Sequence, residues 1–401
     1  MSNIELIIEE KAADIGNFLV GRLLPFREKR AVGPFVFIDH MGPAKLSEYQ
    51  NLDVPPHPHI GLSTLTYLFE GSIFHRDSIG SAIEIRPGAV NWMTAGKGVV
   101  HSERTPEYLR SSDKSLHGFQ IWVGLPKELE KMNPEFHHTE ASEIPTWEEN
   151  GVQYKLIAGE AFRKKSPVPV YSKLFFIEIK NKEKAKINIG QHLFGEVAMY
   201  VLEGTVNIEG HEFGSKQLLV AKNATLCEFE MNENSTVYLF GGEPFPEQRH
   251  IFWNFVSSDR ETIEKAKLDW HDQNLDAFPK VVGDEEEFVP LPKAILKQKT
   301  EQKNNNNMTE IKHHNNEKNG VFEIWYEGEK AGEMTYTWAG DDKLIIDHTE
   351  VDPAFGGKGL AKQLVLAGAN YARENGKKVM PLCTYAKSVF DRNADLQDLL
   401  F

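Results

Sequence analysis

The chain has 401 residues, 40% of them hydrophobic, and a formal net charge of −14 at pH 7. This length favours two or three domains, and the apolar content is sufficient for real cores, which excludes a disordered protein. The acidic balance argues against a general nucleic-acid binder, because such proteins depend on neutralising phosphates. We therefore expect no direct contact with nucleic acid.

The two cysteines and the N-terminus bear on the cellular compartment. Cys227 and Cys383 lie far apart in the sequence, so a disulfide framework is not expected and a reducing compartment is favoured. The first residues are acidic and lack the basic and apolar regions of a secretory signal. No apolar stretch is long enough to cross a bilayer. The sequence thus predicts a cytoplasmic protein with no membrane partner.

The first third of the chain is a series of short apolar segments separated by glycine turns. Residues 4–25 are typical of edge strands, and His40 at the end of a later strand is interpreted as a hydrogen-bonded structural histidine. Many short strands with glycine turns favour an antiparallel barrel or sandwich, and the interior of a small barrel can hold a ligand or metal. The further strands that we expect lie at residues 35–38, 64–70, 71–88 (a hairpin), 89–94, 99–101 and 119–123.

Two short motifs in this region indicate a metal site. His57 and His59 are two residues apart, as are His101 and Glu103. Residues two apart on a strand point to the same face, so neighbouring strands would bring three imidazoles and one carboxylate together. This set suits iron, copper, nickel or zinc and leaves coordination positions open for water or substrate. The alternative is that these histidines are polar residues on exposed strands.

The second third resembles a degraded copy of the first. Residues 59–71 and 192–204 both begin at a histidine and reach Glu-Gly at the same distance, which implies two related β-domains. The copy lacks the metal-binding residues. Gly190 stands at the position that corresponds to His57, and residues 214–230 carry no His-x-Glu. We interpret this half as scaffold or interface, with Cys227 as a buried apolar side chain.

A helix is expected after this second barrel. Residues 257–259, Ser-Ser-Asp, can cap its N-terminus, and Ile263, either Ala266 or Lys267, and Trp270 follow at helical spacing. We expect this helix, with the tail to Pro292, to close the second β-domain.

Five motifs in the first 290 residues resemble the pirin family of the cupin superfamily. The resemblance implies two tandem antiparallel cupin β-barrels and a mononuclear metal, usually iron as Fe(II), in the N-terminal barrel. The family's four ligands fall on His57, His59, His101 and Glu103. The motifs are FREKRAVGPFVFIDHMGP, PPHPHIGLSTLTYLFEG, HRDSIGS, RPGAVNWMTAGKGVVHSE and LHGFQIWVGLPKELEKMNP.

The same resemblance implies two roles. Several pirins resemble quercetin 2,3-dioxygenase, in which dioxygen opens an aromatic flavonol with loss of carbon monoxide, and Glu103 would then be a ligand and a catalytic base. The alternative is a regulatory protein that binds transcription factors or metabolic enzymes and uses the redox state of the metal as a switch. Either role needs the same metal site.

The last part of the chain begins with a polar, Asn-rich stretch, and residues 293–320 are expected to form a flexible linker. A strand meander follows, and then a glycine loop, a helix and a strand over residues 352–383. Leu360, Leu364, Ala367 and Tyr371 lie along one face of that helix, and 375–376, Asn-Gly, is a good C-terminal stop. The three strands of the meander are expected at residues 321–328, 332–340 and 343–351.

The glycine loop indicates a site for a pyrophosphate, because free backbone N–H groups and the helix dipole both favour an anion there; a tight turn is the alternative. The segments IIDHTEV, FGGKGLAKQLV and MPLCTYAKSVF resemble a compact subgroup of GNAT-type acetyltransferases. The resemblance implies acetyl-CoA binding, with Gly356 at a place where Arg or Gln is expected. The loop residues are Gly356, Gly357, Lys358, Gly359, Leu360 and Ala361.

Cys383 has two interpretations. The resemblance implies a nucleophile at this position, whereas the residue pattern alone favours a buried cysteine that ends a strand. In all, we predict a mainly β protein with four parts: a metal-binding cupin barrel, a second barrel with a terminal helix, a linker and a small α+β GNAT-like domain. Their predicted ranges are 1–135, 136–292, 293–320 and 321–401.

Overall fold

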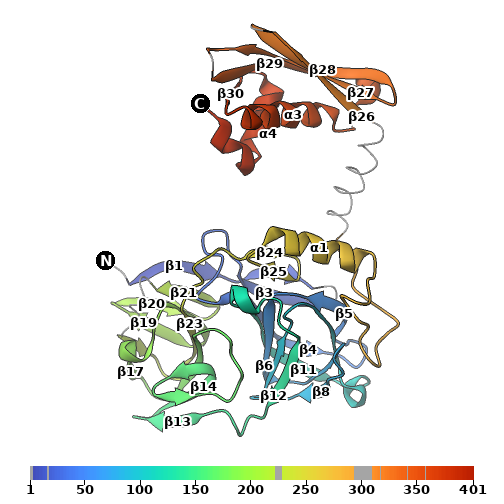
Figure 1. Ribbon diagram of the computed structural model, residues 1–401. Helices are drawn as coiled ribbons and strands as arrows, with labels where there is room; N and C mark the ends of the chain where they lie inside the picture. Colours follow the sequence, from blue (N-terminus) through green and yellow to red (C-terminus); the bar gives the residue numbers. More distant parts are fainter. Residues whose placement is uncertain are drawn as a thin grey trace. The chain divides into compact units, whose positions relative to one another are not determined.

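The computed structural model describes residues 3–401 except 16–17, 222–227, 293–308, 317, 341 and 357 (Figure 1). The chain forms two compact units, a larger unit of residues 1–291 and a smaller unit of residues 292–401. Strands dominate both units, which confirms the predicted mainly β class. No helix among the described residues is long and apolar enough to cross a membrane. Cys227 lies outside the described residues.

The first barrel of the larger unit consists of two facing antiparallel sheets. The seven-stranded sheet has the order β12-β9-β6-β11-β4-β3-β2, and the four-stranded sheet has the order β5-β10-β7-β8. Their strands are β2 (Lys11–Asp14), β3 (Leu19–Leu24), β4 (Phe35–Leu46), β5 (Asp53–His59), β6 (Leu62–Glu70), β7 (Ile73–Asp77), β8 (Ala82–Ile85), β9 (Val90–Thr94), β10 (Val99–Arg104), β11 (Lys114–Gly124) and β12 (Glu135–Thr139).

The second barrel repeats this plan. Its larger sheet has the order β1-β21-β18-β23-β16-β14-β13, with β15 paired to β14, and its smaller sheet has the order β17-β22-β19-β20. β18 therefore takes the place of β6, which confirms the internal repeat. The strands are β1 (Ile4–Glu9), β13 (Thr146–Glu149), β14 (Val152–Ala161), β15 (Lys164–Lys165), β16 (Leu174–Asn181), β17 (Ala185–Asn188), β18 (Glu196–Glu203), β19 (Thr205–Ile208), β20 (His211–Gly214), β21 (Gln217–Ala221), β22 (Glu228–Met231) and β23 (Thr236–Gly242).

The N-terminal strand of the larger unit belongs to the second barrel, and the C-terminal hairpin packs on the first, which corrects the predicted boundaries. β1 pairs with β21, so residues 4–9 belong to the second barrel and not to the first. The hairpin of β24 (His250–Phe252) and β25 (Phe255–Ser257) packs on the first barrel instead, where Val256 joins a core cluster with residues of β4, β6 and β11. The expectation that the terminal helix and tail close the second barrel is therefore wrong. Val256 and Ile8 find apolar neighbours on the barrel that is more distant in sequence.

The helix after this hairpin agrees with its predicted cap. In α1 (Arg260–His271) the Asp259 carboxylate accepts hydrogen bonds from the backbone N–H groups of Glu261 and Thr262. Ile263 and Trp270 are buried, as their spacing predicts, and of the two alternatives between them Ala266 is the buried residue. Short 3-10 helices complete the unit at Glu107–Leu109, Lys127–Leu129 and Gly190–His192.

The larger sheets of the two barrels pack against each other around an apolar core that both share. A few buried polar groups lie at this junction. The predicted structural role of His40 is confirmed, because its Nδ1 is 2.6 Å from Glu10 Oε1 and its Nε2 is 2.8 Å from His117 Nε2. Glu10 also accepts a hydrogen bond from the Tyr200 hydroxyl.

The smaller unit is a five-stranded sheet with helices on it. The order is β26-β27-β28-β29-β30, and only the β29–β30 pair is parallel. α3 (Leu360–Glu374) buries Leu360 and Leu364 against the sheet and ends at Asn375, as predicted. The other elements are β26 (Thr309–Asn315), β27 (Asn319–Tyr326), β28 (Glu329–Trp338), β29 (Lys343–Val351), β30 (Lys378–Pro381), α4 (Thr384–Asp391) and 3-10 helices at Pro353–Phe355 and Ala394–Leu399.

The predicted linker is shorter than expected. Residues 309–315 form β26, which pairs with β27 along its whole length, so the prediction of a linker to residue 320 is wrong for this stretch. The segment is polar and carries little apolar signal, but the His313 ring stacks on Phe322 with centroids 4.0 Å apart. The rest of the predicted linker, residues 293–308, lies outside the described residues.

Candidate metal centre

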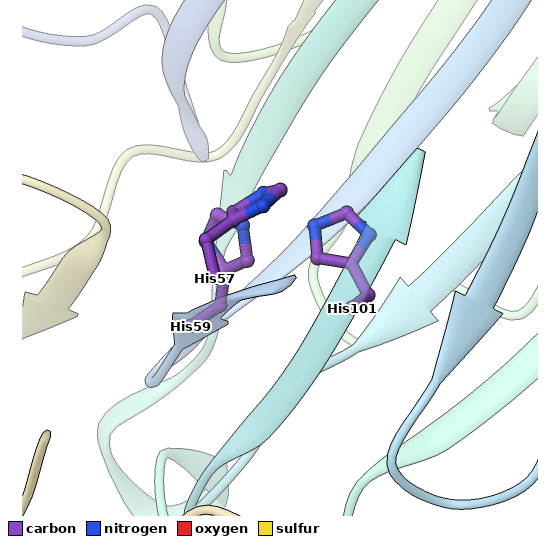
Figure 2. A group of neighbouring side chains, drawn as sticks. All are labelled: His57, His59 and His101. Carbon is purple, nitrogen blue, oxygen red and sulfur yellow. The ribbon is translucent and has the colours of Figure 1, made fainter. Parts of the chain in front are cut away.

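Two adjacent antiparallel strands bring three predicted ligands together. In the register of β5 and β10, His57 lies opposite His101, and His59 lies two residues further along β5. One ligand atom from each of the three rings lies within 4.8 Å of the others. Figure 2 shows the three imidazoles gathered in this group. The period of two along a strand thus gives the convergence that the sequence predicts.

All three imidazoles are in the state that binds metal. Burial lowers the pKa of His57 to about 4 and holds the pKa of His59 and of His101 well below the ordinary value. The rings are therefore neutral at pH 7, and each neutral ring offers one nitrogen lone pair. Among the described residues, nothing hydrogen-bonds to the Nε2 atoms of His59 and His101.

These unpartnered nitrogens fit a transition-metal ion. A buried polar atom without a partner costs about 1–3 kcal/mol, so a native structure normally supplies it with one. His57 Nδ1 lies 2.9 Å from the Pro55 carbonyl oxygen, to which it donates, which leaves Nε2 as its lone-pair nitrogen. Three neutral imidazoles in one place form a donor set that iron, nickel, copper and zinc accept.

Glu103, the fourth predicted ligand, does not join this group in the structure. It lies two residues beyond His101 on β10, but the register with β5 shifts between the two residues. Its carboxylate accepts a hydrogen bond of 3.4 Å from Thr66 on β6. Burial raises the pKa of Glu103. The structure therefore brings together three of the four residues, and the role of Glu103 as a ligand stays a prediction.

Sequence reasoning missed two polar residues beside the histidines. On β7, which pairs with the other side of β10, Asp77 lies opposite His101 and His75 lies opposite Glu103. His75 Nδ1 is 3.4 Å from His101 Nδ1, and His75 Nε2 is 3.1 Å from the Asp77 carboxylate. Burial raises the pKa of Asp77, but hydrogen bonds from His75 and Ser81 outweigh it and hold the pKa below its ordinary value. Their His-x-Asp spacing places both side chains on one face of a strand, and this pattern in the sequence could have identified them.

A C-terminal segment, residues 278–291, lies against the edge of these strands; we call it the strap. Val289 N–H donates to the Pro56 carbonyl at 2.8 Å, and Arg104 on β10 forms a bidentate ion pair with Asp284 at 2.6 and 2.8 Å. His57 and Glu103 are 8% and 9% exposed, whereas His59 and His101 are each 1% exposed. Of these four side chains, His57 and Glu103 therefore retain the most exposure.

The second barrel has a different interior. The space inside it is filled by an apolar cluster that includes Phe175, Ile177, Met199 and Leu239. His192 makes a ring contact with Phe162, with centroids 4.4 Å apart. Among the described residues, no other three His, Cys, Asp or Glu side chains gather as the three histidines do.

The glycine loop of the smaller unit leads into α3 as the sequence predicts. Gly359 is the N-cap residue and adopts φ +72°, a left-handed conformation that favours glycine. Leu360 and Ala361 begin the helix, and no acidic side chain occupies its first turn. Gly356 ends the preceding 3-10 helix, and the Lys358 ammonium lies 4.8 Å from the centroid of the Tyr326 ring. Gly357 lies outside the described residues.

Cys383 occupies the N-cap position of α4 and is only partly buried. Its backbone N–H donates to the Ile346 carbonyl at 3.0 Å, which ties it to β29. Burial raises the pKa of the thiol, but hydrogen bonding from the backbone of the first turn of α4 outweighs burial, so the pKa lies below its ordinary value. Cys383 is thus a partly exposed thiol at a helix N-terminus, and its role as a nucleophile stays a prediction.

Comparisons with known proteins agree with this architecture. Residues 18–123 match the family model described as pirin, and residues 175–276 match the pirin C-terminal cupin domain. The chain is 47% identical over 292 residues to a pirin-like protein of Caulobacter vibrioides, a match that covers 72% of this chain and 99% of that relative. This chain belongs to the pirin family. It is also 28% identical over 275 residues to the pirin of Rattus norvegicus, a match that covers 67% of this chain and 90% of that relative.

Structural similarity extends over the same pirin part of the chain. A crystal structure of quercetin 2,3-dioxygenase from Acinetobacter baumannii superposes with a TM-score of 0.65 at 32% identity, and covers 72% of this chain and 94% of that chain. Beyond the pirin part, residues 321–399 match the model described as GCN5-related N-acetyl-transferase. The chain therefore joins a two-barrel pirin unit to an acetyltransferase-like domain.

Loss of one imidazole should abolish tight metal binding. We expect His101→Ala to weaken binding of a divalent transition ion by more than the roughly 10–100-fold typical of outer-shell changes, because it removes one of three ligands. His117→Ala is the matched control, since His117 is a buried strand histidine of the same barrel that contacts His40 instead. Competition with a chromophoric chelator measures both affinities. Equal affinity in the two variants would contradict the assignment.

Proposed function

We propose that the pirin unit is a metal-dependent dioxygenase of the quercetin 2,3-dioxygenase type, acting on flavonols or related aromatic compounds. The observation that carries the proposal is the group of three buried, neutral imidazoles with unpartnered Nε2 atoms at His59 and His101. The structural similarity to an Acinetobacter baumannii quercetin 2,3-dioxygenase supports the choice of reaction. Both atoms of dioxygen enter the ring-opened product, and one ring carbon leaves as carbon monoxide.

The ion supplies one part of this chemistry. When bound by His57, His59 and His101, Fe(II) or another divalent transition ion acts as a Lewis acid that lowers the pKa of a flavonol hydroxyl. The rest depends on side chains. Trp122 places its ring edge-on to His59, with centroids 5.1 Å apart, and Phe37 stacks on Trp122 at 3.9 Å. These rings form an apolar wall beside the histidines.

Glu103 is assigned as the fourth ligand and as the residue that can accept the flavonol proton. Its pKa is raised by burial, and a general base works best when its pKa lies near the operating pH. Like His57, it retains slightly more exposure than His59 and His101. The Thr66 hydroxyl lies 3.4 Å from the Glu103 carboxylate and 2.9 Å from Gln120 Oε1, and its single hydrogen is donated to one of these two acceptors at a time.

A second candidate function uses the same metal without turnover. The near-complete burial of His59 and His101 favours a metal-sensing or redox-sensing regulatory protein, because a sensor needs metal access but no room for a large substrate. Its partners would be proteins such as transcription factors or metabolic enzymes. The turnover experiment below separates the two functions.

Removal of the Glu103 charge should stop turnover. We expect metal-loaded protein to consume quercetin in an oxygen-dependent manner and Glu103→Gln to lower kcat by about 10²–10⁴, the usual range for loss of a general base. Glu178→Gln is the control, because Glu178 is a buried strand glutamate of the second barrel. Absorbance of quercetin and release of carbon monoxide are measured together. If the loaded wild type leaves quercetin intact under oxygen, the dioxygenase proposal is wrong and the sensor is favoured.

We also propose that the smaller unit binds acetyl-CoA and transfers the acetyl group to an amine, with Cys383 as the nucleophile. The support is geometric. A glycine loop leads into the N-terminus of α3, where free N–H groups favour a pyrophosphate. β30 pairs with β29 only as far as Pro381, while β29 continues to Val351. The far end of β29 therefore has β28 on one side only within the described sheet, and an extended ligand can pair with its other edge.

Two glycines at opposite ends of α3 test this site. Gly359 and Gly376 have φ of +72° and +64°, and a Cβ at either would meet nothing within 4 Å, so Gly→Val strains both alike. We expect Gly359→Val to weaken acetyl-CoA binding by about tenfold or more, because the side chain intrudes on the N–H groups of the loop. Gly376→Val should bind as the wild type does. Isothermal titration measures this, and an equal loss in both variants would contradict the site.

The thiol has its own test with the same protein. We expect Cys383→Ser to bind acetyl-CoA normally but to lose the acetylated protein that intact-mass spectrometry detects after incubation of the wild type with acetyl-CoA. Acetylation that persists in the serine variant, with cleavage by neutral hydroxylamine absent, would place the acetyl group elsewhere than on sulfur.

A further inference from the structure

We infer that Asp77 and His75 are positioning residues that fix the tautomer and the ring orientation of His101, so that its Nε2 lone pair faces the metal. The inference rests on the proposed metal site of the pirin unit and goes beyond its ligands. It concerns a continuous row of contacts on β7 and β10, from the Asp77 carboxylate through the His75 ring to the His101 ring.

The row begins at a carboxylate that can only accept hydrogen bonds. Asp77 is fully buried, and its oxygens accept from Ile79 N at 3.1 Å and from Ser81 N at 2.8 Å. These bonds belong to the turn that joins β7 to β8, so the local backbone sets the position of the carboxylate. His75 Nε2 lies 3.1 Å from the remaining acceptor position. Because an ionised carboxylate carries no proton to donate, Nε2 of His75 must carry the hydrogen.

This assignment propagates to His101. A neutral imidazole with its hydrogen on Nε2 has a bare lone pair on Nδ1. His75 Nδ1 lies 3.4 Å from His101 Nδ1, so one of these atoms donates to the other, and we assign His101 as the donor, which keeps its own lone pair on Nε2. An independent observation agrees, because His101 Nε2 is a buried atom for which no described residue supplies a partner. The row of contacts therefore leaves the metal-binding nitrogen free and oriented.

The middle ring of the row is held on its face as well as at its edges. Phe136 of β12 stacks on His75 with centroids 4.5 Å apart and an interplanar angle of 22°. His75 is buried, and the register of β7 and β10 fixes its position along the strands relative to His101. Outer-shell hydrogen bonds of this kind orient metal-binding histidines and raise their basicity. The pair thus acts through His101 and lies outside the group of three proposed ligands.

The larger unit contains a second array of the same kind that serves as a control. Glu10, His40 and His117 also form a carboxylate–imidazole–imidazole row, with contacts of 2.6 and 2.8 Å. That row lies at the junction of the two barrels and contacts Tyr200 instead of the three histidines. Glu10→Gln therefore makes the same chemical change as Asp77→Asn, in a similar row that does not reach the metal site.

The experiment measures Co²⁺ binding to the full chain. In Asp77→Asn the amide can donate to His75 Nε2, which places the His75 hydrogen on Nδ1 and forces His101 to carry its own on Nε2. We expect the Co²⁺ affinity to fall by about 10–100-fold and the visible ligand-field spectrum of bound Co²⁺ to change. Glu10→Gln should keep the affinity and spectrum of the wild type. Thermal melting of the metal-free proteins shows that each variant is folded.

Two further variants make each result decisive. If Asp77→Asn does not melt cooperatively, His75→Phe replaces it, because it keeps a ring against Phe136 but removes both nitrogens, and the same loss of affinity is expected. Folded Asp77→Asn or His75→Phe with wild-type affinity and spectrum would overturn the inference. If the inference is overturned in this way but His101→Ala no longer binds Co²⁺, the proposed metal site still stands. Retention of Co²⁺ in His101→Ala would instead overturn the site itself.

Discussion

The pairing of β5 with β10 is the contact on which the functional architecture depends. Its antiparallel register places His57 opposite His101, and the alternation along β5 brings His59 to the same face. β7 adds Asp77 and His75 from the other side of β10. A slip of one residue in either pairing would turn these side chains to the opposite face. The strap and its Arg104–Asp284 ion pair lie against this part of the sheet and limit its exposure.

The two barrels show how one strand order supports different interiors. Both have a large sheet and a small sheet with the same sequence of neighbours, yet the first encloses histidines, Glu103 and Thr66, while the second is filled with apolar side chains. The second barrel contributes in other ways, through the apolar core that the large sheets share and through its pairing with β1. One barrel thus has the properties of a site and the other those of a support.

Much of this arrangement could be predicted from periodicity and turn residues. The period of two placed His57, His59 and His101 on one face, and the helical period placed Ile263 and Trp270 in the core. Other features depend on contacts between distant segments. A short strand carries no signal for the sheet edge that it joins, which is why β1 and the strap were assigned to the wrong barrels. His75 was missed because only the pairing of a third strand, β7, with β10 brings it next to His101. β26 was missed because its backbone pairing with β27, and not its apolar content, keeps it in the sheet.

The most direct test of the account is an anomalous difference map from crystals of the metal-loaded chain, collected at the absorption edge of the ion. The account predicts one peak per pirin unit, bonded to ring nitrogens of His57, His59 and His101, with the Glu103 carboxylate as the fourth protein ligand. A peak bonded to other residues, or no peak in crystals grown with excess metal, would contradict the central claim. A peak on the three histidines alone would keep the site and remove Glu103 from its ligands.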